Sequence, residues 1–226
     1  MNTLSSQFMR VILLVLISMP LATVALAETV ADRPKVRLSS LEWAPYIGSD
    51  MTRRGYVYEL VKTAYDRQGY DVDIIFYPWA RALRLAQAGE VSGLMPEYYD
   101  ASREADFAFS EPFPGGPVGF YKRKSSSISF PGDPVLEPHK TFRKMKDYRF
   151  GVVRGYINTR AFDEADFLTK DEAVSDEINL RKLFHERVDL IFIDQHVARY
   201  LINNLPTDYN QQLEFMSPAL ENKSLY

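Results

Sequence analysis

The chain has 226 residues, of which 46% are hydrophobic and 25% are charged, a composition that is ordinary for a globular protein. Its formal net charge of −3, with no basic run longer than Lys122-Arg123-Lys124, argues against a nucleic-acid partner. There is no cysteine, which excludes disulfides and a lipid-anchoring cysteine. The three histidines are scattered without partners at ligand spacing, so we expect no metal and no other cofactor.

The N-terminal segment has the pattern of a secretory signal peptide. Arg10 precedes an apolar run from Val11 to Ile17, and Ala25-Leu26-Ala27 has small residues at the two positions that a signal peptidase reads. The run is short for a bilayer span, which leaves a membrane anchor as the less favoured alternative. We therefore expect residues 1–27 to be removed after Ala27 and the remainder to be exported to a bacterial periplasm.

The first half of the chain alternates between strand and helix patterns. The clearest element is a helix, because apolar side chains from Val57 to Tyr65 recur at helical spacing and Gly69 is placed for a left-handed C-cap. Alternating or continuous apolar runs on either side predict strands. The predicted elements are a strand at 35–41, a helix at 55–69, a strand at 71–77, a helix at 79–88 and a strand at 91–95.

The composition changes at Pro114-Gly-Gly-Pro117, which predicts a flexible joint and a crossing between domains. Asn158 or Thr159 could cap one helix, and Ser175-Asp-Glu starts another. Asp194, after a fully apolar run, is either a helix cap or a binding residue. The predicted elements of this half are strands at 118–121, 149–153 and 189–193, an exposed loop at 125–138, and helices that begin near 159, at 175 and near 195.

Strands that alternate with helices and are apolar on both faces predict parallel sheets covered by helices. In such sheets ligands bind beyond the carboxyl ends of the strands. We therefore expect an α/β fold of two lobes, each a mostly parallel sheet flanked by helices, with lobe 1 at 28–114, lobe 2 at 115–226 and a ligand cleft between them. The residues that follow four of the strands are Trp43 and Tyr46, Glu97 and Tyr98, Gly155 and Tyr156, and Asp194.

Two further residue types suit such a cleft. Arg103 could clamp a carboxylate through its planar, bidentate guanidinium, or could simply begin a surface loop. Trp43 and Trp79 each have a proline nearby and stand after strands, which favours a role in lining the pocket over a role in the core.

Taken in order, these motifs resemble those of the bacterial periplasmic solute-binding proteins of family 3, the polar amino-acid type. The resemblance covers nearly all of the mature chain. It implies that Trp43 stacks on the ligand and that Trp79 forms an apolar wall. It also implies that Arg103 holds the α-carboxylate of the ligand and that Asp194 accepts its α-amino group. The segments that carry it are Trp43-Ala-Pro-Tyr46, Trp79, Ser102-Arg103 with Asp106-Phe-Ala-Phe-Ser110, Gly151-Val-Val-Arg-Gly155, and Arg187-Val-Asp-Leu-Ile-Phe-Ile-Asp194.

The chain also departs from the family. Glu97, Tyr98 and Tyr156 stand where the family has small hydroxyl residues, so the ligand does not carry over with the fold. The sequence stops at Tyr226, about where the family's second crossing between lobes is expected. Either the sequence is a fragment that lacks the C-terminal segment, or lobe 1 does without its usual closing helix, and we favour the fragment. In both cases we expect apolar surface to be left uncovered on the helix at 55–69.

The resemblance implies a monomeric, non-enzymatic binding protein that captures a small zwitterionic or anionic, amino-acid-like solute. It would deliver this solute to an ABC permease or a membrane sensor. One alternative is a periplasmic enzyme similar to the cyclohexadienyl dehydratases, in which Glu97 would be the acid. Another is an orphan sensory ligand-binding lobe. The binding hypothesis predicts that Arg103 and Asp194 lie on opposite walls of one cleft.

Overall fold

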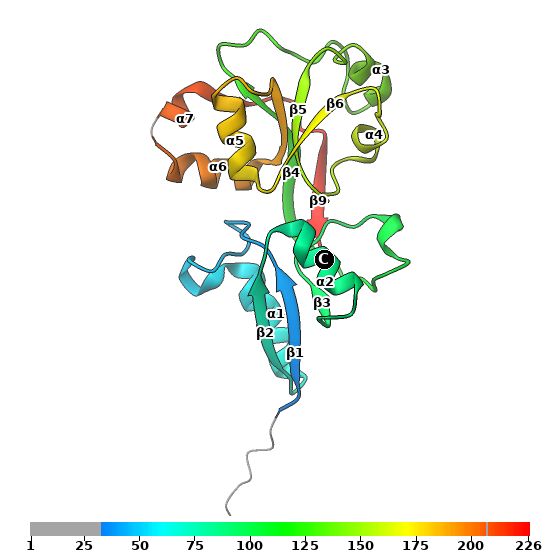
Figure 1. Ribbon diagram of the computed structural model, residues 1–226, viewed down its shortest axis with the longest axis vertical. Helices are drawn as coiled ribbons and strands as arrows, with labels where there is room; N and C mark the ends of the chain where they lie inside the picture. The colour runs from blue at the N-terminus through cyan, green and yellow to red at the C-terminus, as the bar shows by residue number, and fades with distance from the viewer. Residues whose placement is uncertain (1–32, 207) are drawn as a thin grey trace, which may run out of the picture. The chain divides into compact units, whose positions relative to one another are not determined.

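The strands of the protein form two sheets, as the sequence predicts. The computed structural model describes residues 33–226 except residue 207, so the predicted signal peptide lies outside the described residues. Three parallel strands form one sheet in the order β2-β1-β3, and six strands form the other in the order β6-β5-β7-β4-β8, with β9 beside β4. We call the part built on the three-stranded sheet lobe 1 and the part built on the six-stranded sheet lobe 2 (Figure 1).

Lobe 1 carries two α-helices beside its parallel strands. Gly55 precedes the first of them with a φ of 90°, and a Cβ atom there would lie 2.4 Å from the carbonyl oxygen of Tyr46. Only glycine fits, and its backbone fixes the turn that follows β1 against the start of α1. The elements are β1 (Lys35–Ser40), a 3-10 turn (Thr52–Arg54), α1 (Tyr56–Arg67), β2 (Asp71–Phe76), α2 (Trp79–Gln87), β3 (Gly93–Leu94) and a second 3-10 turn (Ala101–Arg103).

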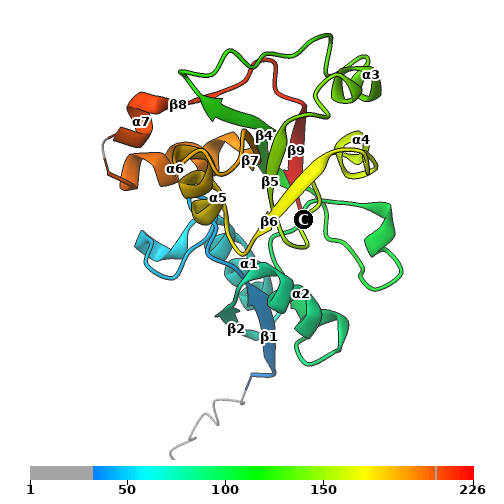
Figure 2. The ribbon, with the colours of Figure 1, turned by 45° about the horizontal axis from the view of Figure 1, so that its top comes forward.

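Lobe 2 is organised around a cluster of phenylalanine rings. The ring of Phe120 lies 5.2 Å from that of Phe150 and 5.4 Å from that of Phe162, and all three side chains are fully buried. In Figure 2 the helices α5 and α6 and the helices α3 and α4 lie on opposite sides of β5 and β6. The elements are β4 (Phe113–Arg123), α3 (Pro138–Arg143), β5 (Arg149–Val153), α4 (Arg160–Asp163), β6 (Thr169–Ala173), α5 (Asp176–Phe184), β7 (Leu190–Asp194), α6 (Gln195–Asn204), α7 (Asp208–Gln212), β8 (Leu213–Phe215) and β9 (Glu221–Leu225).

Two helices of lobe 2 have side-chain N-caps, of which Asp194 is predicted from the sequence. The cap predicted at Asn158 or Thr159 is absent, because the side chain of Thr159 makes no capping hydrogen bond and that of Asn158 donates to Asp163 Oδ1. The hydroxyl of Ser175 accepts a hydrogen bond from the backbone N–H of Ile178 at the start of α5. The Oδ1 atom of Asp194 accepts the N–H groups of His196 and Val197 at 2.7 and 3.1 Å. Each cap satisfies N–H groups that the first turn of the helix cannot pair internally, and this fixes where the strand gives way to the helix.

The crossing between the lobes differs from the prediction. Residues 114–117 are not a loop but part of β4, which pairs with β9 from Phe113 to Val118. The two prolines are tolerated because this stretch of β4 has a partner on one side only, as in an edge strand. A second crossing is also present, since Leu225 in β9 pairs with Phe113 and bridges to Tyr98, and Tyr226 exchanges backbone hydrogen bonds with Glu97.

Lobe 1 has an apolar groove on its surface. Leu60 of α1 is 43% exposed, and Val61 and Tyr65 line the groove together with Leu94 and Phe107. Val57, on the same helix, is fully buried.

The third strand of lobe 1 is shorter than predicted. It covers only Gly93–Leu94, which pair with Leu38 and Ser39 of β1, whereas the apolar run predicts a strand at 91–95. Pro96 cannot donate a ladder hydrogen bond, so pairing stops before it. The chain instead turns here and carries Glu97 and Tyr98 toward lobe 2.

Among residues 33–226, position 207 aside, no helix has both the length and the apolar character that a membrane crossing needs.

Candidate functional site between the lobes

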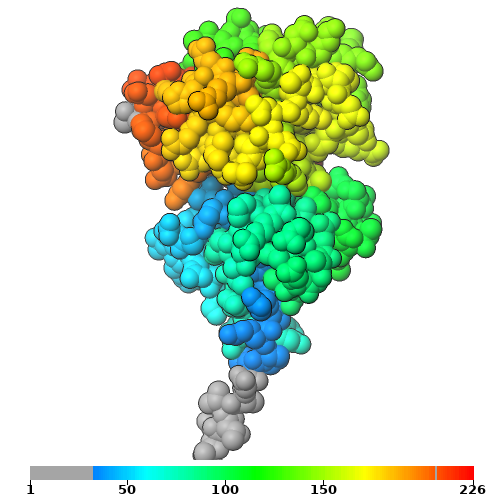
Figure 3. Space-filling view, in the orientation of Figure 1, coloured from blue at the N-terminus to red at the C-terminus, as the bar shows by residue number. Residues whose placement is uncertain are grey.

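The two lobes are in contact (Figure 3), and side chains that follow the strands form hydrogen bonds between them. Five side-chain hydrogen bonds join the strand-end residues of the two lobes within the described chain, and in each of them lobe 1 donates and lobe 2 accepts. We call the two surfaces the donor wall and the acceptor wall. The bonds run from Trp43 Nε1 to Asp176 Oδ2 (3.1 Å), from Tyr46 Oη and Tyr98 Oη to Asp194 Oδ2 (2.9 and 3.0 Å), and from Trp79 Nε1 and Arg103 Nη2 to the carbonyl oxygen of Gly155 (2.9 and 3.0 Å).

Asp194 is the centre of the acceptor wall. One carboxylate oxygen caps α6, and the other accepts the phenols of Tyr46 and Tyr98, so the cap and the cleft contact coexist. The side chain is buried, and burial raises the pKa of its carboxyl above the ordinary value in spite of these four donors. Burial also raises the pKa values of both phenols, which keeps them protonated as donors.

Asp176 is a second buried carboxylate on the same wall, and the sequence did not single it out. It is the first residue of α5 and is 5% exposed. Its Oδ2 atom accepts the indole N–H of Trp43 and the phenol of Tyr156, both at 3.1 Å. Burial raises the pKa of Asp176 to about 7, and the nearby charge of Asp194 adds to the effect. The strand that precedes Asp176 is polar and mostly exposed, so no apolar run in the sequence marks this acid as a strand-end residue.

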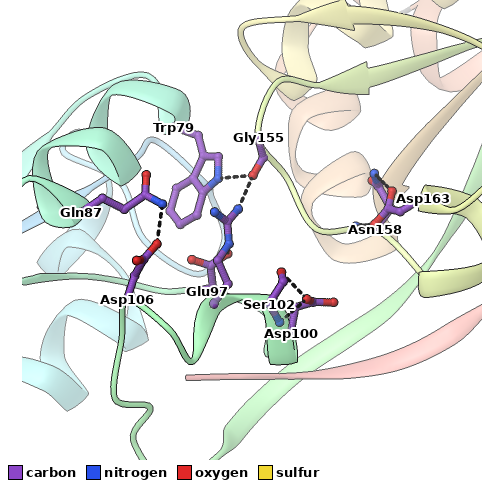
Figure 4. A network of polar contacts seen from close by, with 10 residues as sticks. Trp79, Gln87, Glu97, Asp100, Ser102, Asp106, Gly155, Asn158 and Asp163 are labelled. Atoms are coloured by element: carbon purple, nitrogen blue, oxygen red, sulfur yellow. Dashed lines mark hydrogen bonds and ion pairs between the residues drawn. The ribbon is translucent and has the colours of Figure 1, made fainter.

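Arg103 and Glu97 form an ion pair at the donor wall. Arg103 Nε lies 3.7 Å from Glu97 Oε1, and its Nη2 donates to the Gly155 carbonyl oxygen (Figure 4). Glu97 is 7% exposed, and its backbone is held by Tyr226. Burial raises the pKa of Glu97 to about 7, while the charge of Arg103 opposes the rise.

Four aromatic rings pack between these acids. Trp43 lies with its ring centroid 5.4 Å from that of Tyr98 and 6.2 Å from that of Tyr156, and Trp79 lies 6.0 Å from Tyr156. All of these contacts are edge-to-face. They border a pocket of about 260 Å³, counted with its open mouth, of which only about 20 Å³ is open to the centre of a water molecule. The pocket is lined by Leu41, Trp43, Trp79, Pro96, Glu97, Tyr98, Tyr156 and Ile157.

The structure brings the residues that the sequence singles out to one interface. Arg103 lies on lobe 1 and Asp194 on lobe 2, and each makes a hydrogen bond to the opposite lobe. Aromatic rings fill most of the space beside Glu97 and Tyr98. A larger hollow of about 670 Å³, counted with its open mouth, lies next to it and is lined from both lobes, with Trp79 on one side and Tyr156 and Ser175 on the other. The described residues contain no group of three or more His, Cys, Asp or Glu side chains arranged to hold a metal ion.

Comparison with known proteins finds no matching family model and no curated protein of similar sequence. Solved structures do match. One is a histidine kinase sensor domain described as similar to periplasmic binding proteins, with a TM-score of 0.72 and 16% identity, covering 86% of this chain and 82% of that one. The fold is that of the two-lobed periplasmic binding proteins.

Two further structures support the same fold. An ancestral arginine-binding protein bound to arginine has a TM-score of 0.65 and 15% identity, with 85% and 84% of the two chains covered. The GluR0 ligand-binding core from Nostoc punctiforme, in complex with L-glutamate, has a TM-score of 0.66 and 16% identity, with 84% and 82% covered. At these identities the likeness establishes the fold and leaves the ligand open.

Proposed function

We propose that this protein is a periplasmic solute-binding protein of the family 3 type, which closes its two lobes around a small solute that carries a positively charged nitrogen. The observation that carries the proposal is the one-way hydrogen bonding between the walls. The carboxylates of Asp176 and Asp194 on lobe 2 receive their cross-cleft donors from Trp43, Tyr46 and Tyr98 on lobe 1.

This arrangement suits a solute that replaces the cross-lobe bonds. When the lobes separate, each buried carboxylate loses its donors from lobe 1, and the positive charge of a ligand nitrogen would stabilise it in their place. β4 and β9 are the two strands that run between the lobes, so hinge motion would be confined to these segments. Closure on a solute would then restore the contacts around it.

The predicted signal peptide and the fold support export to the periplasm. A protein exported there would meet its partners at the membrane. Structural neighbours include the substrate-binding protein of an amino-acid ABC transporter and a histidine kinase sensor domain. We therefore propose that the closed form is read by an ABC permease or by a membrane sensor.

The test is a thermal-shift screen of the purified protein against amino acids, amines and sugar acids. A ligand at one hundred times its Kd adds about 2.7 kcal/mol to stability. For a chain of this size that corresponds to a rise in Tm of about 5–10 °C. Small-angle scattering of each positive sample should show a more compact particle, and a panel without any such compound would contradict solute capture.

The matched variants are Asp194→Asn and Asp50→Asn. Asp194 lies buried at the interface, and its loss should weaken binding of a screened hit by at least about tenfold, because one charge-assisted hydrogen bond is worth about 1.5–3 kcal/mol. Asp50 is exposed on the same chain, and its variant should bind like the unchanged protein. Equal affinity in the two variants would place the ligand elsewhere.

The dehydratase alternative is favoured by one observation, which is that Glu97 is buried in the pocket with a pKa of about 7. A carboxyl of this kind is partly protonated at neutral pH and could donate a proton to a leaving group. The same protein sample, incubated with a cyclohexadienol carboxylate, should release no aromatic product if binding is the function. Turnover that disappears in Glu97→Gln would favour the enzyme.

A further inference from the structure

The pocket between the lobes has the lining of a cation-binding cage. Four of its eight lining residues are the aromatic side chains Trp43, Trp79, Tyr98 and Tyr156. Within the described chain Glu97 is the single charged residue of that lining. Aromatic faces attract organic cations, by about 0.5–1 kcal/mol each when exposed and about 2 kcal/mol when water is excluded. The rest of the lining is apolar and offers an anion no partner.

Two carboxylates that accept hydrogen bonds from these aromatic side chains strengthen the attraction for a cation. Asp176 accepts hydrogen bonds from Trp43 and Tyr156, and Asp194 accepts one from Tyr98. Negative charge on these acceptors adds to the negative potential at the ring faces, and charges act strongly where little water is present. Tyr98 already has a cation near its ring, since Lys223 Nζ lies 5.1 Å from the centroid and is itself paired with Glu221 at 3.7 Å.

The arginine that would hold a ligand carboxylate already faces an internal one. Arg103 Nη2 donates to the Gly155 carbonyl oxygen at 3.0 Å, and its Nε lies 3.7 Å from Glu97 Oε1, close enough for an ion pair but without a hydrogen bond. Figure 4 shows Glu97 below Trp79 and Gly155. A ligand carboxylate placed at Arg103 would lie against the carboxylate of Glu97, and two like charges in a buried site repel each other.

We propose that Glu97 takes the place of the ligand's carboxylate in this chain, and that the ligand is an organic cation without a carboxylate. Its charged nitrogen sits among Trp43, Trp79, Tyr98 and Tyr156. This inference rests on the proposed capture of a solute between the lobes and narrows its chemical class. Since the pocket in the closed arrangement has room for little more than a water molecule, the cation enters as the rings and walls move apart.

Two sets of probes separate charge from shape. The first is choline, its carboxylate-bearing counterpart glycine betaine, and its neutral isostere 3,3-dimethylbutan-1-ol. The second is agmatine, its carboxylate-bearing counterpart L-arginine, and the uncharged analogue N-(4-hydroxybutyl)urea. Isothermal titration calorimetry on the unchanged protein gives a Kd for each probe. We expect choline or agmatine to bind at least about tenfold more tightly than its carboxylate-bearing counterpart, and the two neutral analogues to give no measurable heat.

Variants then test the role assigned to Glu97. Glu97→Gln removes the internal carboxylate and frees Arg103, so the preference for the carboxylate-free cation should fall by at least about tenfold or reverse. Glu111→Gln is the matched control, because Glu111 is an exposed glutamate of the same lobe, and it should keep the preference of the unchanged protein. Circular dichroism spectra and melting curves of both variants establish that they are folded.

The results that would overturn the cation inference differ from those that would overturn solute capture. Tighter binding of glycine betaine and L-arginine than of choline and agmatine overturns the inference, and so does equal binding of the neutral analogues. Solute capture would still stand in either case, because closure would still occur. Binding of none of the six probes also overturns the inference, and the wider thermal-shift screen then decides separately whether the protein binds any solute.

Discussion

Trp43 and Trp79 make similar hydrogen bonds across the cleft, but their acceptors differ. The Gly155 carbonyl oxygen, which accepts from Trp79, also accepts from Arg103. Asp176, which accepts from Trp43, is a buried carboxylate that would retain the neutral phenol of Tyr156. The loss of a hydrogen-bond donor costs more stability at a buried carboxylate than at a carbonyl oxygen that keeps a second donor.

We therefore expect Trp43→Phe to lower the free energy of unfolding by about 2–3 kcal/mol and Trp79→Phe by about 1 kcal/mol. Urea unfolding at pH 8, where Asp176 is mostly ionised, measures both. Phenylalanine keeps an aromatic ring in each place, so the comparison isolates the N–H donor. A larger loss for Trp79→Phe would mean that Asp176 is not the acceptor that matters.

The two acids of the acceptor wall show what sequence patterns capture at the level of single residues. Asp194 follows a fully apolar strand, so its place at the edge of a sheet can be predicted from the sequence. Asp176 follows β6, whose sequence Thr-Lys-Asp-Glu-Ala is polar and mostly exposed because the strand lies at the edge of the sheet. Because β6 has no apolar run, the sequence does not predict a strand there. Asp176 is then predicted only as part of the first turn of a helix.

At the level of elements, β4 holds the walls at their spacing through a glycine. A Cβ atom at Gly116 would lie 2.5 Å from the Tyr46 phenol oxygen and 2.8 Å from Asp194 Oδ2. The strand therefore approaches the hydrogen bond between these residues as closely as a backbone can. We expect Gly116→Ala to break that bond and to lower the free energy of unfolding by about 1–3 kcal/mol.

Urea unfolding of Gly116→Ala beside Gly132→Ala measures this effect. At Gly132 the added Cβ would meet the side chain of Thr141 at 3.1 Å, which a small adjustment relieves. The control variant should stay within about 0.5 kcal/mol of the unchanged protein, the usual range for surface substitutions. Equal losses in the two variants would contradict the close approach of β4 to the cleft.

The helices and buried strands follow from local patterns, but the crossing strands do not. Two prolines and two glycines in β4 indicate a joint, and the polar sequence Glu-Asn-Lys-Ser-Leu of β9 indicates no strand. These segments are extended because they pair with each other over a large separation in sequence. Pairing between distant segments overrides local strand propensity, so sequence patterns over short windows do not predict these two strands.

For the molecule as a whole, the interface gathers more acids than bases. Glu97, Asp176 and Asp194 are buried there, and Arg103 is paired with Glu97. Aromatic rings and phenols, which carry no charge at neutral pH, make up most of the remaining surface. Such an interface binds protons when it is closed, so closure and pH are linked.

The sign of this linkage gives the last prediction. Burial raises the pKa values of Asp176 and Glu97 to about 7, whereas in an unfolded chain these carboxyls titrate near 4. Between these values the folded protein holds more protons than the unfolded chain, so stability is greatest near pH 4–5 and falls as the pH rises to about 8. The groups that face Asp176 are Tyr156 and Asp194, and those that face Glu97 are Arg103 and Asp100.

We expect the free energy of unfolding to fall by a few kcal/mol at most between pH 5 and pH 8, since one pKa unit corresponds to about 1.4 kcal/mol. Asp176→Asn and Glu97→Gln should each flatten this fall, because neither replacement titrates. Asp50→Asn, at an exposed position, should leave the slope unchanged. Urea unfolding at intervals of half a pH unit gives the profile. A rise in the free energy of unfolding from pH 5 to pH 8 would mean that the folded interface holds Asp176 and Glu97 ionised. The predicted linkage between pH and stability would then be wrong.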